Sequence, residues 1–295
     1  MTYFFKSATG TVAGLLLRLL SISSLTGLLL AAPAYADMEK IMQSGVLRVA
    51  VYDDFAPFSL HSKGGNLADN KNAGIDIDLA QALAKKIGLK LALLPFPAGE
   101  NLNDDLRNMV WKGHYLGYGP ADLMLHVPVD MALMKDNPQV TIFAPYHTET
   151  VRLVYNVATV PDYRGLASMA GKKIGVEKVS IGAMVLLGEE DGRYRNDIKI
   201  FTTPIEALEQ LKAGGLDGVL ANRSEIESVL RDDPRFEMRE VAFQRLPRKG
   251  WSVGMAVKKD NPELARLLQT AMDELFTSGE MISIFARYGV QIVKP

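Results

Sequence analysis

The stretch Asp122-Leu123-Met124-Leu125-His126-Val127-Pro128-Val129-Asp130 contains the strongest strand signal in the chain. Its apolar run Leu123–Leu125 has the length of a buried strand core. Pro128 has no N–H for a sheet hydrogen bond, so we expect the strand to end near Val127. His126 and Asp130 would then lie at its carboxyl end, where open α/β sheets bind ligands. The alternative is a core strand followed by a solvated turn, with these two residues as a structural hydrogen-bonded pair.

The segments on both sides of this stretch predict two successive series of alternating strands and helices. The first series has strands at 46–51 and 90–94 and helices at 79–88 and 102–111. The second has strands at 172–176, 198–201 and 218–221 and helices at 181–187, 204–212 and 225–230, and we also expect a helix over 162–170. Such alternation is typical of mostly parallel sheets. No flexible linker separates the series, which favours an α/β protein of two lobes joined by strands.

The N-terminal segment has the pattern of a secretory signal peptide. Lys6 and Arg18 precede the apolar run Leu19–Ala32, and Ala34-Tyr35-Ala36 matches a cleavage site. The apolar run is shorter than the roughly 20 residues that a membrane-spanning helix needs. We therefore predict cleavage before Asp37 and an exported, soluble mature protein of 259 residues.

Composition excludes several functional classes. Loss of Lys6 and Arg18 with the leader changes the formal charge from −1 to −3, which argues against a nucleic-acid partner. The chain has no cysteine, so disulfides, thiol nucleophiles and cysteine-ligated zinc are excluded. A mature chain of this length suits one large domain or two lobes of about 100–150 residues.

Several short motifs, in order and at regular spacing, resemble the bacterial periplasmic solute-binding proteins of family 3. They are Gly45–Ala50 with Phe55–Phe58, Gly74–Ala80, Ala121–Leu123, Phe143–Tyr146, Ala170–Val176, Gly215–Gly218 and Val253–Lys259. The resemblance implies the type II periplasmic binding protein fold, with two mostly parallel sheets joined by two crossover strands. It places lobe 1 at 37–150 plus 253–295 and lobe 2 at 151–252, with a ligand cleft between them.

The resemblance also assigns site residues, and it shows two departures from amino-acid binders. It implies that Phe55, beside Asp53, is the stacking aromatic of the cleft and that Ser180 lies in the turn that offers backbone N–H groups. The arginine that clamps an α-carboxylate in the family falls near Met134, and the aspartate that binds the ammonium falls at Asn222. We therefore predict a cleft that is not built for free α-amino acids, in which Arg223 could replace the missing anion clamp.

A narrower resemblance involves the run Trp111–Pro120 and the following His126–Asp130. Both are similar to binding-protein-like proteins of the MxaJ/XoxJ type, which are associated with PQQ-dependent quinoprotein dehydrogenases. This implies an accessory role in methanol or other alcohol oxidation, with Tyr115 and Tyr118 as a partner surface or a wall of the cleft. The alternative is a solute receptor of an ABC importer for a small polar or aromatic solute.

The candidate cleft residues are thus Asp53, Phe55, His126, Asp130, Ser180, Asn222 and Arg223. Phe55 could instead be a core plug, and Arg223 a solvated surface residue. His147 and Glu149 share a strand face near the crossover, where we expect a hinge hydrogen bond rather than a metal. We find no nucleophile–base pair, and therefore predict a non-catalytic protein. We also predict that it is a periplasmic monomer without cofactor or metal.

Overall fold

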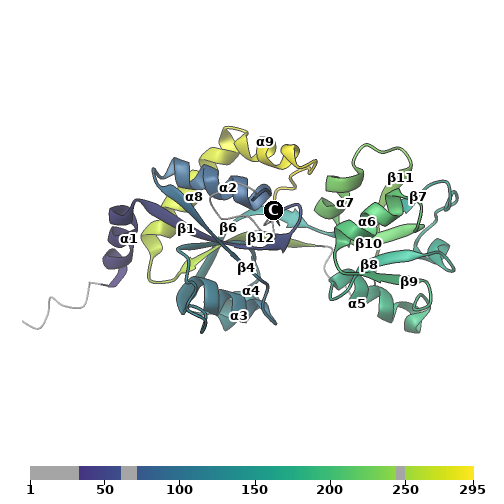
Figure 1. The fold of residues 1–295 in the computed structure, drawn as a ribbon, viewed down its shortest axis with the longest axis horizontal. Coiled ribbons are helices and arrows are strands. Elements are labelled where there is room, and N and C mark those ends of the chain that lie inside the picture. The colour runs from purple at the N-terminus through teal and green to yellow at the C-terminus, as the bar shows by residue number, and fades with distance from the viewer. Residues whose placement is uncertain (1–32, 61–71, 244–249) are drawn as a thin grey trace, which may run out of the picture.

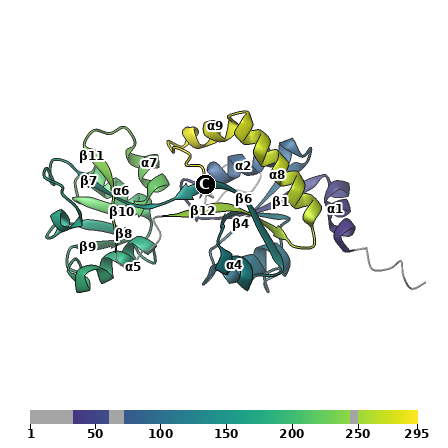
Figure 2. The same cartoon turned by 180° about the vertical axis from the view of Figure 1, so that it is seen from behind.

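The structure, a computed structural model, describes residues 33–60, 72–243 and 250–295. Figure 1 shows two α/β units that lie side by side, and Figure 2 shows them from behind. Residues 1–32, which form most of the predicted signal peptide, residues 61–71 and residues 244–249 lie outside the described residues. Within the described ranges, no helix is both long and apolar enough to cross a membrane.

Lobe 1 is built on a five-stranded sheet in the order β4-β1-β5-β12-β6. Its strands are β1 (Val46–Tyr52), β4 (Lys90–Phe96), β5 (Leu123–Pro128), β6 (Val140–Glu149) and β12 (Trp251–Lys258). A small hairpin, β2 (Asp54–Phe55) with β3 (Ser59–Leu60), follows β1. The lobe's helices are α1 (Pro33–Ser44), α2 (Ile75–Lys86), α3 (Leu102–Leu106), α4 (Met131–Asp136), α8 (Pro262–Thr277) and α9 (Glu280–Arg287). A π-helical turn, Arg107–Trp111, extends α3.

Strand β5 lies at the centre of this sheet because it is apolar on both faces. It pairs in parallel with β1, where Val49 is opposite Leu123, and antiparallel with β12. One face packs under α2, α8 and α9, and the other packs on α3 and the π-helical turn. All residues from Leu123 to Val127 are buried, as expected of a strand covered by helices on both faces.

Lobe 2 repeats the design with a sheet in the order β11-β7-β10-β8-β9. Its strands are β7 (Val151–Asn156), β8 (Ile174–Glu177), β9 (Ile198–Phe201), β10 (Gly218–Asn222) and β11 (Phe236–Glu240). Its helices are α5 (Ile181–Gly188), α6 (Pro204–Lys212) and α7 (Arg223–Leu230), with 3₁₀ turns at Leu166–Met169 and Glu189–Gly192. Two apolar clusters, one on each face of this sheet, form the core of the lobe.

Two segments connect the lobes. Strand β6 ends at Glu149 and β7 begins at Val151, so the chain passes from the first sheet to the second in one residue. The chain comes back to lobe 1 at the start of β12, where Trp251 pairs with Glu149. The lobe limits predicted from the family, 37–150 plus 253–295 and 151–252, lie close to these two crossings.

The structure differs from the sequence predictions at three places. Strand β5 includes Pro128, because the next N–H, that of Val129, continues the pairing by donating to the Ser252 carbonyl at 2.8 Å. The helix expected over 162–170 is only the 3₁₀ turn, because Gly165 has a φ of 129° that no helix contains. Strand β11 was not predicted, because only two apolar residues, Phe236 and Met238, alternate with its charged residues, which is a weak strand signal.

Candidate functional site

A cavity of about 340 Å³ lies between the two lobes. It is lined from lobe 1, from both crossings and from lobe 2 by Tyr52, Asp53, Asp54, Phe55, Ala98, Leu102, His126, Pro128, Glu149, Glu177, Asn222 and Trp251. The residues of lobe 1 lie at or just after the carboxyl ends of β1, β4 and β5, and Glu177 and Asn222 end β8 and β10. These are the strand ends at which α/β sheets bind ligands.

A larger hollow of about 470 Å³ lies at the other end of the lobe 1 strands, beside α1. Its main charged groups already form ion pairs. Arg48 binds Asp122 at 2.9 Å, and Lys258 binds Asp37 at 3.3 Å. We therefore take the cavity between the lobes as the candidate site.

The charge of the cavity lining is one-sided. It contains the carboxyl groups of Asp53, Asp54, Glu149 and Glu177, and no lysine or arginine among the described residues. Burial raises the pKa of Glu177, and the nearby Asp54 carboxylate raises it further. Because Asp54 and Glu177 belong to different lobes, like charges face each other across the cavity. Such a site attracts a cation and repels an anion.

Phe55 lies at the boundary between the cavity and the core of lobe 1. Its ring stacks on Phe58 at 5.4 Å and meets the edge of the His126 ring at 4.7 Å. The ring also lines the cavity. The two interpretations of Phe55, cleft platform and core plug, describe two faces of the same ring.

His126 is held by a buried hydrogen-bond network in the core of lobe 1. Its Nδ1 lies 3.2 Å from Oδ2 of Asp76, and its backbone N–H donates to the Tyr146 hydroxyl at 3.0 Å. That hydroxyl donates to the other Asp76 oxygen at 2.8 Å. The partner of His126 is thus Asp76 rather than Asp130, whose carboxylate accepts N–H groups from the first turn of α4 and does not line the cavity.

The other predicted site residues lie near the cavity in different roles. Ser180 caps α5 by accepting from the Ala183 N–H at 3.0 Å, and it is not part of the lining. Asn222 does line the cavity. Arg223 is turned toward α7 and the C-terminal segment, where it binds Glu227 at 2.6 Å and Gln291 at 3.1 Å. Its guanidinium is therefore engaged in a contact between elements and does not supply an anion clamp to the lining.

Glu225, in the first turn of α7, is a buried acid behind the cavity wall. Its carboxylate accepts from the backbone N–H of Asn222 at 2.8 Å and from the Asn222 side chain at 3.1 Å. Burial raises the pKa of Glu225 well above 4.5, opposed by the Asn222 N–H, and the carboxylates of Glu149 and Glu177 raise it further. The side of the cavity near the crossing strands therefore holds several acidic groups close together.

This raised pKa predicts a pH dependence of stability. Above pH 4.5 the unfolded chain loses the Glu225 proton while the folded protein keeps it, so the free energy of unfolding falls as pH rises from there to the folded pKa. Glu225→Gln should remove this contribution. We expect the free energy of unfolding of the variant, measured with denaturant, to rise relative to that of the wild type by about 1 kcal/mol or more between pH 5 and pH 8. A difference that does not change with pH would contradict the assignment.

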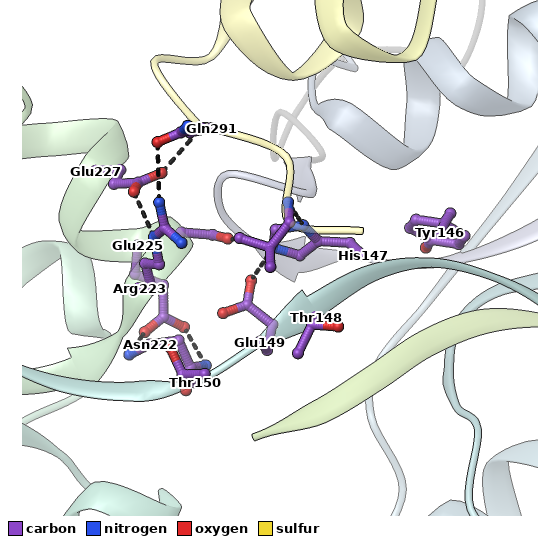
Figure 3. Close-up of polar contacts among 12 residues, drawn as sticks. Tyr146, His147, Thr148, Glu149, Thr150, Asn222, Arg223, Glu225, Glu227 and Gln291 are labelled. Carbon is purple, nitrogen blue, oxygen red and sulfur yellow. Dashed lines mark hydrogen bonds and ion pairs between the residues drawn. The ribbon is translucent and has the colours of Figure 1, made fainter. Parts of the chain in front are cut away.

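His147 ties the first crossing to lobe 2 and to the C-terminal segment (Figure 3). Its Nδ1 accepts the Val293 N–H at 3.1 Å, so in the neutral ring the proton is on Nε2. Nε2 lies 3.0 Å from the Ser224 hydroxyl and 3.2 Å from a carboxylate oxygen of Glu149. Within the described ranges, no group of three or more His, Asp or Glu side chains is arranged to hold a metal ion.

The loop before β5 places its aromatic residues outside the cavity. Tyr115 has 88% of its surface exposed and Leu116 has 68%. Tyr118 packs on the lobe 1 core and stacks against His114 at 4.2 Å. The two tyrosines therefore do not form a wall of the cavity, and Tyr115 is available to a partner.

The architecture, two α/β lobes with crossing strands and a cavity between them, is the two-lobed periplasmic binding protein fold. A solved ancestral cationic amino acid solute-binding protein has the same fold, with a TM-score of 0.66 and 19% identity, over 86% of this chain and 99% of the other. Residues 47–109 match the model of the bacterial extracellular solute-binding proteins, family 3. The comparisons support the family 3 solute-binding class that the motifs indicate.

Two curated relatives that match over most of their length are named as binding proteins. The "Probable histidine-binding protein" of Neisseria gonorrhoeae is 26% identical over 82% of both chains. An ABC transporter arginine-binding protein of Escherichia coli is 23% identical over 72% of this chain and 79% of its own. A short match of 58 residues, 43% identical and covering 20% of each chain, is to the cyclohexadienyl dehydratase of Pseudomonas aeruginosa.

Sequence reasoning missed most of the acidic groups of the cavity. Asp54, Glu149 and Glu177 were not assigned to the site, although Glu177 directly ends a predicted strand and Glu149 lies at a predicted crossing. The strand-end rule could have found Glu177. No local signal shows that these three acids, which are 28 to 123 positions apart, meet around one cavity.

Proposed function

We propose that this protein is a non-catalytic periplasmic receptor that captures a small cationic solute between its lobes and delivers it to an ABC permease. The acidic lining carries this proposal, because the described residues of the cavity offer four carboxyl groups and no lysine or arginine. The named ligands of the relatives, histidine, arginine and cationic amino acids, are consistent with a solute that bears positive charge.

The same lining supports a mechanism of capture. Asp54 on lobe 1 and Glu177 on lobe 2 repel each other across the cavity. A cation between them converts repulsion into attraction toward both lobes, and so favours the closed arrangement. Phe55 offers an aromatic face to the solute, and such faces attract cations. The short crossings allow closure by hinge motion.

Calorimetry on the mature protein, purified from the periplasm and stripped of ligand by partial unfolding, tests this proposal. Arginine, lysine, histidine and their decarboxylated amines form one panel, and glutamate, succinate and phosphate form the other. We expect at least one cationic compound to bind with a dissociation constant in the micromolar range or below, and the anions to show no heat. Binding confined to anions, or no binding by any cation, would contradict the proposal.

The accessory role with a quinoprotein dehydrogenase is a second candidate, and one observation favours it. Tyr115 and Leu116 are exposed together at the tip of the loop before β5. Exposed aromatic residues are common at protein interfaces. Recovery of a large dehydrogenase subunit with the periplasmic protein, lost on Tyr115→Ala, would support this role, whereas an unchanged recovery from the variant would remove its structural basis.

A further inference from the structure

Glu149 is the buried acid of the cavity that the fold leaves without a hydrogen bond. Its side chain is 1% exposed, and neither carboxylate oxygen has a hydrogen-bond partner. Nε2 of His147 lies 3.2 Å from Oε1 of Glu149, a contact that is an ion pair only when the ring is protonated, and its hydrogen bond is with the Ser224 hydroxyl. Burying a carboxylate without a hydrogen bond is costly, so its retention at a cavity wall points to a partner that arrives from the cavity.

The surroundings of Glu149 make a charged partner necessary. The Glu149 carboxylate lies close enough to the buried Glu225 carboxyl to raise the pKa of Glu225 further. Glu149 itself ends β6 at the crossing between the lobes and is one of the residues lining the cavity (Figure 3). A neutral ligand would leave this carboxylate unpaired, whereas an ammonium or guanidinium group would both pair it and donate hydrogen bonds.

We propose that Glu149, together with Asp54 and Glu177, forms a binding site for a solute with two cationic nitrogen groups and no carboxylate, namely a small diamine or an amino-guanidine. This inference rests on the proposed receptor function and specifies its ligand class. Two positive groups match the four acids of the lining better than one does. The absence of lysine and arginine from the described lining leaves a ligand carboxylate without a cationic partner.

The site also couples binding to closure. Asp54 belongs to lobe 1, Glu177 to lobe 2 and Glu149 to the crossing strand. A solute that contacts all three needs both lobes in place, so its binding energy favours the closed arrangement. A monoamine that reaches one acid alone lacks this advantage and should bind more weakly than a diamine of similar length.

Calorimetry with matched pairs of probes tests the ligand class. The pairs are agmatine with arginine, and 1,5-diaminopentane with lysine; each amine differs from its amino acid only by the carboxylate. Pentylamine tests the second cationic group. We expect at least one of the two amines to bind about tenfold or more tightly than its amino acid, and 1,5-diaminopentane to bind more tightly than pentylamine. Equal or tighter binding of both amino acids would overturn the inference.

Glu149→Gln tests the residue, with Glu209→Gln on the exposed face of α6 as a matched control. We expect Glu149→Gln to weaken binding of the tighter amine about 30-fold or more. The ligand-free variant should melt about 2 °C or more above wild type, because an unpaired buried charge has been removed. A purely structural Glu149 would instead lower the melting temperature, or prevent folding, on substitution. The control should change neither quantity.

The outcomes separate this inference from the proposed function. If no amine and no amino acid binds, the receptor proposal fails and this inference fails with it. If a cationic solute binds but Glu149→Gln leaves its affinity unchanged, the receptor proposal stands and the assignment of Glu149 is wrong. A Glu149→Gln protein that does not fold counts against the assignment, and Glu177→Gln then tests whether the cavity acids bind the amine at all.

Discussion

Replacing Asp76 with alanine is expected to lower the free energy of unfolding by about 2–6 kcal/mol. Asp76 is 2% exposed and accepts hydrogen bonds from the Tyr146 hydroxyl at 2.8 Å and from the His126 ring at 3.2 Å. The substitution leaves both buried partners unsatisfied, and each such group costs about 1–3 kcal/mol. Because the network joins α2 to β5 and β6, its loss should also loosen the lobe 1 wall of the cavity.

Chemical denaturation of Asp76→Ala, Tyr146→Phe and the double variant measures this effect. Burial, followed by the Asp76 carboxylate, raises the pKa of Tyr146 well above 10, so its hydroxyl stays protonated as the donor. In the double variant this donor is absent, and the combined loss should be smaller than the sum of the single losses by about 1 kcal/mol or more. Losses that simply add would mean that the hydroxyl and the carboxylate do not act together.

Replacing Gly74 with alanine is expected to cost about 3 kcal/mol or more. Gly74 precedes α2 and has a φ of 147°, and an added Cβ would lie 2.1 Å from the carbonyl oxygen of Phe58. Backbone strain of this kind costs about 1–3 kcal/mol by itself, and the clash adds to it. The hairpin that carries Phe55 and Phe58 would have to move, so binding in the cavity should weaken together with stability.

Gly45→Ala is the matched control for this variant. Gly45 also has a positive φ, 65°, but an added Cβ would have no atom within 4 Å. Its substitution therefore reports conformational strain without a clash, and should cost about 1–2 kcal/mol. Thermal and denaturant unfolding of the two variants separates the cost of backbone strain from the cost of the clash. If Gly74→Ala is no more destabilising than Gly45→Ala, the close approach to Phe58 does not constrain this turn.

Local sequence patterns predicted most helices and strands, because these elements depend on side-chain periodicity within a short segment. The apolar run Leu123–Leu125 predicts the buried strand, and helical spacing of Leu79 and Leu83 predicts α2. The same patterns placed strands whose carboxyl ends line the cavity, and Asp53, Phe55, His126 and Asn222 were predicted as cleft residues and are found in its lining. The edge strand β11 escaped prediction because its alternation involves only two apolar residues, Phe236 and Met238.

The chemistry of the site was much less accessible, because it depends on partners that are distant in the sequence. Arg223 was considered as an anion clamp, yet Gln291, 68 positions away, and Glu227 hold its guanidinium. The alternative interpretation paired His126 with Asp130, whereas Asp76, 50 positions away, lies beside its ring. The link to a quinoprotein dehydrogenase remains a prediction, and the comparisons favour the solute-receptor alternative on which the proposed function is built.

By itself the sequence determined the alternating strands and helices, the two lobes that they imply and the strand ends at which a ligand would lie. Those features follow from side-chain periodicity and backbone chemistry within a few residues. Only the tertiary structure decided the sign of the site's charge. Carboxyl groups from β2, β6 and β8 meet around one cavity, while the nearby arginine is turned away to Glu227 and Gln291. Coulomb interactions depend on distances in space, and the fold alone sets those distances.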